Sequence, residues 1–246
     1  MTEQPLDDRV AIVTGASSGV GSATARSLAS DGADVVLAAR REERLEELAT
    51  EIRRDENVQA LPVSTDVRDP AQVEALVDAA VEELGGLDVL VNNAGLLRGS
   101  DVESMTDDEF RTMQATNVDG VFYATRAALP HLRESAGHLI YVGSFAGQYP
   151  RPFNPVYAAT KWWVRGFALS VAAQVGGDDV AVTVVNPSEV RTEFGPEGGE
   201  PFKEQYDEGD VTEPVEVAEA IAFAAGREGS TVSELDLYRR DKLTMF

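Results

Sequence analysis

Cysteine is absent from this sequence of 246 residues, and lysine is almost absent. Without cysteine, disulfides and thiolate chemistry are excluded, and an intracellular, cytoplasmic location is expected. Only three lysines occur, at Lys161, Lys203 and Lys242, so most of the 21 basic residues are arginines. No apolar run approaches the roughly 20 residues that span a bilayer, and the stretch from Met1 to Asp8 is too acidic and polar for a secretory signal. A membrane partner is therefore not expected.

Positive charge is scarce as well. The chain has 43 acidic and 21 basic residues, which gives a formal net charge of −22. Such a surface repels phosphate backbones, so a nucleic-acid partner is not expected. Two interpretations of the acidic surface stay open: it has no special role, or it is an adaptation to high salt, where self-repulsion is screened over short distances. We favour the second.

Apolar runs alternate with helical patterns along the whole chain. Short, continuous apolar strands in such an alternation are typical of a parallel sheet. We expect a single-domain, Rossmann-type α/β fold over residues 1–246, with about seven strands in a doubly wound parallel sheet and helices on both faces. No linker or repeat divides the chain. The expected strands are Val10–Thr14, Asp34–Ala39, Val58–Val63, Asp88–Val91, His138–Ser144, Val180–Asn186 and Glu234–Leu237. The expected helices are Val20–Ser30, Glu42–Arg54, Ala71–Leu84, Asp107–Arg133, Pro155–Val175 and Pro214–Ala225.

The first apolar run leads into a glycine-rich turn with the spacing G-x-x-x-G-x-G. Glycines permit a tight turn and a close approach of the backbone, and the following helix aims free N–H groups and its dipole at a pyrophosphate. The alternative is an ordinary glycine-rich βα turn. The candidate cofactor contacts in this turn are Gly15, Ser17, Ser18, Gly19, Val20 and Gly21.

The second expected strand ends at Arg40 and Arg41. A carboxylate at this position would hold the ribose hydroxyls of NAD, whereas arginine suits the 2′-phosphate of NADP. The alternative is a solvated helix start in which both arginines face glutamates of the next turn. The pattern favours NADP(H).

Two further strand ends carry polar side chains. Asp66 and Val67 follow the third strand, where the carboxylate either receives an adenine amino group or caps a turn before the helix at Pro70. The fourth strand delivers Asn92 and then Asn93, Ala94 and Gly95. Two amides followed by small residues are suited to joining neighbouring strand ends and leaving room for a cofactor; in isolation they would indicate a turn.

A hydroxyl, a phenol and an amine lie within one short stretch. Ser144 follows the apolar run 139–142, and Tyr157 and Lys161 are four residues apart in the helical pattern that begins near Pro155. Residues four apart share a helix face, and an ammonium that close to a phenol is expected to lower the pKa of Tyr157. A Y-x-x-x-K pair is also a frequent accident on helices, but the scarcity of lysine here argues against chance.

These features, in this order, resemble the classical short-chain dehydrogenase/reductase family from Val10 to about Tyr238. The matching features are the T-G-x-x-x-G-x-G turn, the N-N-A-G stretch, Asn117 inside a long helical pattern, Ser144, and the Y-x-x-x-K pair. Within the family the chain looks most like NADP-dependent 3-hydroxy acid (serine-type) dehydrogenases, on the stretches 143–146, 156–167 and 233–237.

The resemblance implies an NADP(H)-dependent oxidoreductase that interconverts a secondary alcohol and a carbonyl. It implies that Tyr157 is the acid/base and that Ser144 orients the substrate oxygen. It also implies that Lys161 holds the nicotinamide ribose and lowers the Tyr157 pKa, and that Asn117 anchors a water that relays protons. The alternative is a nucleotide-sensing or scaffolding protein with this fold and no turnover, whose usual mark is a missing tyrosine or lysine.

One stretch departs from the family pattern. After the sixth strand, Pro187, Val190 and Thr192 match the family's nicotinamide-binding residues, but Ser188 stands where a glycine is usual. If that position needs a positive φ, Ser188 is strained or the loop takes another path.

The stretch from about 193 to 213 corresponds in position to the family's substrate loop, with a plain surface loop as the alternative. A carboxylate-bearing substrate would need a cation, for which Arg98, Arg151 and Arg191 are the candidates. His131 and His138 have no ligand-like spacing and are expected to be structural, and no metal site is expected. The candidate substrate-wall residues are Leu96, Leu97, Phe145, Ala146, Tyr149, Phe153 and Phe194.

The family commonly forms tetramers, so the resemblance implies a homo-oligomer, with a small-molecule alcohol or carbonyl compound as the substrate. The helical pattern that carries Tyr157 has more apolar bulk than one buried stripe needs, from Trp162, Trp163, Phe167 and Leu169. A wholly intrachain core is the alternative.

Overall fold

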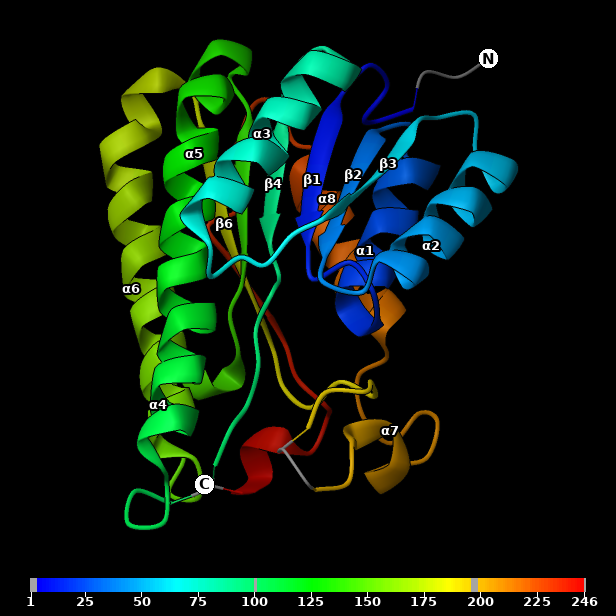
Figure 1. Ribbon diagram of the computed structural model, residues 1–246. Helices are drawn as coiled ribbons and strands as arrows, with labels where there is room; N and C mark the ends of the chain where they lie inside the picture. The colour runs from blue at the N-terminus through cyan, green and yellow to red at the C-terminus, as the bar shows by residue number, and fades with distance from the viewer. Residues whose placement is uncertain (1–3, 100, 196–198, 246) are drawn as a thin grey trace.

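The computed structural model describes residues 4–99, 101–195 and 199–245. Seven parallel strands form one sheet in the order β3-β2-β1-β4-β5-β6-β7, as Figure 1 shows from one side. Three strands have the predicted bounds, and the others differ from the prediction by one or two residues at their ends. The strands are β1 (Val10–Thr14), β2 (Asp34–Ala39), β3 (Ala60–Ser64), β4 (Val89–Asn92), β5 (His138–Val142), β6 (Ala181–Pro187) and β7 (Glu234–Leu237).

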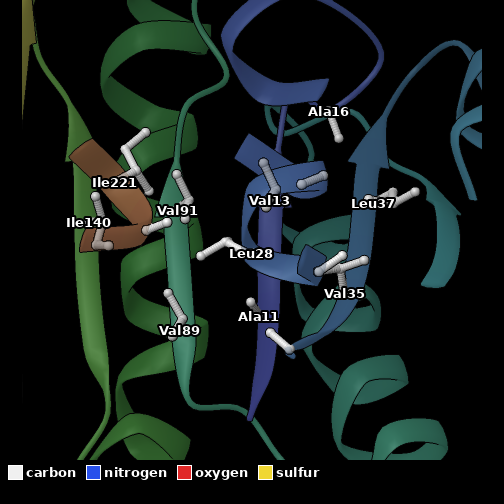
Figure 2. Close-up of a cluster of buried hydrophobic side chains, with 14 of the residues drawn as sticks. Ala11, Val13, Ala16, Leu28, Val35, Leu37, Val89, Val91, Ile140 and Ile221 are labelled. Carbon is white, nitrogen blue, oxygen red and sulfur yellow. The ribbon is translucent and has the colours of Figure 1, made fainter. Parts of the chain in front are cut away.

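Helices cover both faces of the sheet, which confirms the expected Rossmann-type α/β fold. On one face lie α1 (Gly19–Ser30), α2 (Glu42–Asp55) and α8 (Pro214–Ala225), and on the other α3 (Pro70–Leu84), α5 (Gly120–Ser135) and α6 (Pro155–Val175). Each face buries its own cluster of aliphatic side chains. Figure 2 shows the first cluster, in which Leu28 of α1 and Ile221 of α8 lie against Val13 and Val91 of neighbouring strands. This burial fixes the strand ends that carry the polar residues.

The long helix expected over Asp107–Arg133 is wrong as a continuous α-helix. It consists of α4 (Asp107–Gln114), a π-helical turn η1 (Ala115–Asp119) and then α5. The N–H of Gly120 donates to the carbonyl of Ala115, five residues earlier, so one extra residue is accommodated in this turn. Apolar periodicity does not reveal a single inserted residue, and such turns are frequent at functional sites.

The connection after β6 contains a short helix, α7 (Phe202–Gln205), that the sequence analysis did not predict. Residues 196–198 of the expected substrate loop lie outside the described residues. Four residues are too few to show a helical period. Figure 1 shows α7 and the red C-terminal segment, which ends in the 3-10 helix η4 (Lys242–Met245), beyond the carboxyl ends of the strands. Two further 3-10 turns are η2 (Phe145–Gly147) and η3 (Gly176–Asp178).

Among the described residues, we find no helix with the length and apolar character needed to cross a membrane.

Candidate functional site

The glycine-rich turn joins β1 to α1 as predicted. Gly15 has φ +70°, and a Cβ on Gly21 would lie 2.3 Å from the carbonyl oxygen of Gly15, so the turn closes only with glycine at position 21. Ser18 is the N-cap residue of α1, but its side chain makes no capping hydrogen bond. The first N–H groups of α1 are therefore available at the strand ends, which is the arrangement that binds anions.

Arg41 lies directly against this turn. Its Nε donates to Oγ of Ser17 at 3.1 Å, and its Nη2 donates to Oγ of Ser17 at 2.9 Å and of Ser18 at 2.7 Å. The guanidinium also contacts Glu193, whose carboxylate lies 3.3 Å from Arg41 and 2.8 Å from Arg44. Arg41, the predicted arginine at the end of β2, therefore contacts the predicted turn. Its guanidinium is also paired with the Glu193 carboxylate.

Glu193, Arg41, Arg44 and Lys203 form what we call the outer cluster. Nζ of Lys203 is 3.4 Å from Glu193, and the Glu193 side chain is 40% exposed. The hydrogen bond from Arg44 is the largest effect that lowers the pKa of Glu193 to about 2; burial opposes it, and the hydrogen bond from Arg41 adds a smaller lowering. Glu193 is therefore an anion held by three cations beside the turn.

The contacts of Asp66 support the interpretation that it caps a turn, because its carboxylate is paired within the chain and is not free to receive an adenine amino group. Its oxygens accept hydrogen bonds from the guanidinium of Arg68, and Oδ1 accepts the backbone N–H of Arg68 at 3.1 Å. Those bonds lower the pKa of Asp66, to which the nearby charge of Arg40 adds a small effect. The helix cap itself comes from Asp69, whose Oδ1 accepts the N–H of Ala71 at 3.0 Å.

Asn93 joins the ends of β1 and β4. Its Nδ2 donates to the carbonyl of Thr14 at 2.8 Å, and the N–H groups of Asn93 and Ala94 both donate to Oγ1 of Thr14 at 3.0 Å. The predicted stitching of neighbouring strand ends is confirmed. These strands are the two at which the chain reverses its direction of progress across the sheet, the usual ligand crevice of such folds.

The π-helical turn places Asn117 beside the segment that follows β4. Its Oδ1 accepts the N–H of Leu96 at 2.9 Å, and its Nδ2 donates to the carbonyl of Leu96 at 2.9 Å and to Oγ1 of Thr160 at 3.2 Å. Oδ1 lies 3.5 Å, and Nζ of Lys161 3.7 Å, from the point where a Cβ on Gly95 would be. Asn117 thus ties the β4 loop to α6 while one lone pair of Oδ1 remains near the Lys161 ammonium.

Ser144, Tyr157 and Lys161 line one pocket, as their spacing predicted. Ser144 begins η2, and Tyr157 and Lys161 lie one turn apart on α6. The Lys161 side chain is buried, its Nζ donates to the carbonyl of Val142 at 2.8 Å, and it lies 5.9 Å from the ring centre of Tyr157. The hydroxyl, the phenol and the amine are therefore neighbours in space.

The expected lowering of the Tyr157 pKa by Lys161 is not seen. Burial raises the pKa of Tyr157 to about 12, and the groups that act downward are the hydrogen-bonded Ser144 and the charge of Arg151. Burial also lowers the pKa of Lys161 to about 8. Desolvation is therefore the dominant effect on the pKa of both groups, and spacing along a helix contains no information on desolvation.

The stretch after β6 resolves the question raised by Ser188. The described non-glycine residues with positive φ are Asp8, Ala136 and Asp179, so Ser188 does not adopt the left-handed conformation. Its N–H donates to the carbonyl of Leu237 at 2.9 Å, and its Oγ accepts the N–H of Arg239 at 3.0 Å. The loop is unstrained at position 188, and the serine connects it to the C-terminal segment.

The loop after β6 covers Tyr157 with aromatic rings. The ring centres of Tyr157 and Phe194 are 6.0 Å apart, and the series continues through Phe202 to Tyr206. Phe145 is buried and Tyr149 stacks on it at 4.5 Å, whereas Phe153 is 62% exposed. Phe194 is therefore the aromatic side chain of this loop that lies beside the phenol.

The cation candidates separate into two groups. Arg98 and Arg151 line the pocket, but Arg191 pairs with Glu213 at 2.7 Å and is not among the described lining residues. Two cations that the sequence analysis missed, Arg239 and Lys242, do line it. The scarcity of lysine, which drew attention to Lys161, is the one feature of the sequence that could have pointed to Lys242 as a pocket residue.

His138 has a structural environment. It is buried in β5 and its Nε2 shares a hydrogen bond with Oγ1 of Thr183 at 2.8 Å, and burial lowers its pKa to about 4.

Most candidates come together in this one pocket of about 880 Å³ at the carboxyl ends of the strands. Its lining includes both the glycine-rich turn and the C-terminal segment. The predicted residues on the lining are Gly15, Ser18, Gly19, Val20, Gly21, Arg40, Arg41, Asn93, Ala94, Gly95, Leu97, Ser144, Phe145, Ala146, Phe153, Tyr157, Lys161, Pro187, Val190, Thr192 and Phe194. Within the described lining, Ser17, Asp66, Val67, Leu96, Asn117 and Tyr149 do not occur.

Comparison with known proteins gives consistent matches. Residues 9–200 match the short chain dehydrogenase family. An uncharacterised oxidoreductase of Staphylococcus saprophyticus is 36% identical over 236 residues, covering 93% of this chain and 95% of that protein. An alcohol dehydrogenase from the archaeon Thermococcus sibiricus, solved with 5-hydroxy-NADP, superimposes with a TM-score of 0.87 at 31% identity, covering 94% of this chain and 97% of that one.

A second solved structure differs in its cofactor. The 3-ketoacyl-(acyl-carrier-protein) reductase from Brucella melitensis, solved with NADH, has a TM-score of 0.85 at 31% identity and covers 96% of this chain and 98% of that one. Sequence, fold and the site's geometry agree. The chain belongs to the short-chain dehydrogenase/reductase family, whose members are oxidoreductases that use a nicotinamide cofactor.

Proposed function

We propose that the protein is an NADP(H)-dependent oxidoreductase that interconverts a secondary alcohol and a carbonyl compound. The observation that carries this proposal is the meeting of Ser144, Tyr157 and Lys161 in a pocket that also contains the turn bound by Arg41. When bound, the nicotinamide donates or accepts the hydride. Among alcohols, a 3-hydroxy acid is the class favoured by the sequence likeness to serine-type dehydrogenases.

The pocket residues fit such a cofactor. The free N–H groups at the start of α1 suit a pyrophosphate, and the Arg41 guanidinium beside two serine hydroxyls suits a 2′-phosphate. Space beside Gly95 is bounded by Asn117 and Lys161, where polar groups would meet a ribose. We propose that the cofactor-binding residues are Gly15, Ser17, Ser18, Gly19, Val20, Gly21, Arg40, Arg41, Val67, Asn93, Ala94, Gly95, Tyr157, Lys161, Pro187, Val190 and Thr192. Asp66 does not belong to this set because its carboxylate is paired with Arg68.

Four residues share the proton chemistry in this proposal. Tyr157 donates its proton to the carbonyl oxygen as negative charge develops there, or removes a proton from the alcohol in the reverse direction. Ser144 donates a second hydrogen bond to the same oxygen. Lys161 holds the nicotinamide ribose hydroxyls when the cofactor is bound, and Asn117 Oδ1 supplies an acceptor for a water that restores the proton. The described residues of the loop at about 193–213 that line the pocket, among them Phe194, Phe202 and Tyr206, form the wall on the substrate side.

NADPH absorbance across a panel of carbonyl compounds tests this proposal, with wild type and Tyr157→Phe compared. General acid catalysis contributes roughly 10²–10⁴-fold, so we expect a loss of kcat of about that size. Tyr123→Phe, on α5, is the matched control. Equal turnover by Tyr157→Phe and wild type would refute the mechanism, and cofactor binding without turnover by either would favour a nucleotide-sensing protein.

We also propose a homo-oligomer formed through α5 and α6. Trp163 stacks on Phe167 at 4.7 Å within the chain, but Trp162, Leu169 and Phe122 remain 46%, 37% and 40% exposed. Exposed apolar side chains grouped on two helices suit burial against a second copy. Light scattering that gives a monomer mass would reject this.

We infer that the acidic surface is an adaptation to high salt, on the basis of the net charge of −22. The melting temperature should rise from low to molar KCl, and a constant value would contradict the inference.

A further inference from the structure

The C-terminal segment is attached to the pocket by the residue that departs from the family pattern. Ser188 holds the N–H of Arg239 through its hydroxyl, and its own N–H binds the carbonyl of Leu237. Lys242, three residues after Arg239, is the first residue of η4 and lines the pocket. A glycine at position 188 would lack the hydroxyl that makes the first of these contacts.

The segment brings two cations next to a third and to one carboxylate. We call Glu189, Arg151, Arg239 and Lys242 the inner cluster. Glu189 accepts a hydrogen bond from Lys242, and its carboxylate oxygens lie 3.7 Å from Arg151 and 4.0 Å from Arg239. Lys242 and Glu189 are almost fully buried, with side chains 4% and 11% exposed.

The inner cluster has more positive than negative charge. Arg239 also pairs with Asp241 at 3.0 Å, but that carboxylate is 65% exposed and points its charge into solvent. Burial lowers the pKa of Lys242, and although Glu189 raises it, Arg151 and Arg239 lower it further. The cations therefore repel one another at short range, which a bound anion would relieve.

Charge on the whole lining follows the same trend. Of the described lining residues, seven are lysine or arginine and two are glutamate, whereas acidic residues outnumber basic ones two to one in the chain. In a protein with this composition, so many cations around one pocket favour anionic ligands on electrostatic grounds. A nicotinamide cofactor accounts for those near the glycine-rich turn, but not for those beside Phe145.

Arg151 is the cation best placed to bind a ligand. Its guanidinium lies 5.8 Å from the ring centre of Phe145 and 5.1 Å from that of Phe153, and its side chain is 24% exposed. Within the described part of the chain, its guanidinium has no hydrogen-bond acceptor, the nearest carboxylate being Glu189 at 3.7 Å. Arg151 and Tyr157 line the same pocket, and the charge of Arg151 acts to lower the pKa of the Tyr157 phenol.

Resting on the proposed function, we propose that the substrate carries a carboxylate within a few bonds of the reacting carbon, bound by the guanidinium of Arg151. Two parallel N–H groups of an arginine match the two oxygens of a carboxylate. Lys242 and Arg239 add positive potential behind it, and Glu189 holds them in place. Arg151 is thus a binding and specificity residue, distinct from the residues that move protons.

The test compares an acid with its neutral ester. NADP⁺-dependent oxidation of 3-hydroxybutanoate and of methyl 3-hydroxybutanoate is measured for wild type, Arg151→Gln and Arg151→Lys. We expect wild type to favour the acid in kcat/KM, and we expect Arg151→Gln to lower the ratio of kcat/KM for the acid to that for the ester about tenfold or more. Arg151→Lys, which keeps the charge without the fork, should fall between. Arg111→Gln on α4, with a side chain 75% exposed, is the charge-matched control.

A binding measurement separates this proposal from the proposed function. Calorimetry of butanoate and butanamide with the NADP⁺-loaded protein requires no hydride transfer. Binding of butanoate that Arg151→Gln weakens about tenfold, with butanamide unaffected, supports the carboxylate site even if no alcohol is oxidised. Oxidation of the ester at least as efficient as that of the acid, equal losses on both in Arg151→Gln, or no binding of butanoate would overturn it.

Discussion

Two glutamates four residues apart on the loop after β6 each meet three cations, yet they lie in different environments. Glu189 is in the inner cluster, with its side chain 11% exposed, and Glu193 is in the outer cluster, with its side chain 40% exposed. Both have lowered pKa values, but burial opposes the lowering far more at Glu189, where it is the largest single effect. Similar composition therefore gives two different sites.

The two sites differ in the free energy that is lost when each carboxylate is separated from its cations. An exposed ion pair is worth little, so a stronger anion can replace Glu193 at Arg41 cheaply. A buried charge without its partner is expensive, so Glu189 and Lys242 must stay together. We conclude that a bound anion can replace Glu193 in the outer cluster. In the inner cluster Glu189 and Lys242 stay paired, and a bound anion adds to that cluster without displacing Glu189.

The largest expected effect comes from removing Lys242. Lys242→Met leaves Glu189 buried without its closest cation and should lower the free energy of unfolding by about 3 kcal/mol, near the low end for broken buried pairs because Arg151 and Arg239 remain. For a protein of this size that corresponds to a melting temperature lower by roughly 6–12 °C. The matched variant Lys203→Met, in the outer cluster, should change unfolding by no more than about 0.5 kcal/mol. Equal destabilisation by both would remove the distinction between the clusters.

A second effect concerns the cofactor. Arg41→Gln removes a guanidinium that already binds two serine hydroxyls beside the glycine-rich turn, so kcat/KM for NADPH should fall roughly ten- to a hundredfold, the value of hydrogen bonds to a charged group. The value for NADH, which lacks the 2′-phosphate, should be nearly unchanged. Arg44→Gln is the control, because Arg44 contacts Glu193 but is not among the described lining residues. A parallel loss with both cofactors would assign Arg41 to loop structure instead.

The two clusters also differ in how far the sequence predicts them. The strand–turn–helix at Gly15 and the arginine at the end of β2 were predicted, because both features follow directly from local pattern and strand order. The pairing of Tyr157 with Lys161 followed from helix spacing, and the place of Ser144 followed from its position at the end of an expected strand. Local sequence therefore accounts for the cofactor end of the pocket and for the fold.

The inner cluster was not predicted beyond Arg151. Arg239 and Lys242 reach the pocket because β7 pairs with β6 and Ser188 binds the backbone of a segment about fifty residues later, and no local period encodes such contacts. The π-helical turn at Asn117 and the direction of the Tyr157 pKa were missed for related reasons. One depends on a single inserted residue, and the other depends on desolvation by residues distant in the sequence.

The smallest expected effect comes from Glu193. Glu193→Gln removes a carboxylate that competes for Arg41, so the Kd for NADPH should fall about threefold, a size typical of one exposed ion pair. The Kd for NADH should not change. Titration of each cofactor by its fluorescence with wild type and Glu193→Gln measures both values, and Glu46→Gln on α2 controls for the loss of one surface charge. A weaker affinity for NADPH in Glu193→Gln would mean that the carboxylate organises Arg41 rather than competing for it.

The pH dependence of stability follows the same logic. Because the pKa of Glu193 is lowered to about 2 from 4.5, its contribution is present above pH 4.5 and is lost as the pH falls towards 2. Exposure of the side chain limits that contribution to less than about 1 kcal/mol. Urea unfolding at pH 6 and at pH 3 should therefore show a slightly smaller acid-induced loss in Glu193→Gln than in wild type. An identical loss of unfolding free energy in the two proteins would show that the ion pairs of Glu193 do not stabilise the fold. The cations of the outer cluster would then act only in cofactor binding.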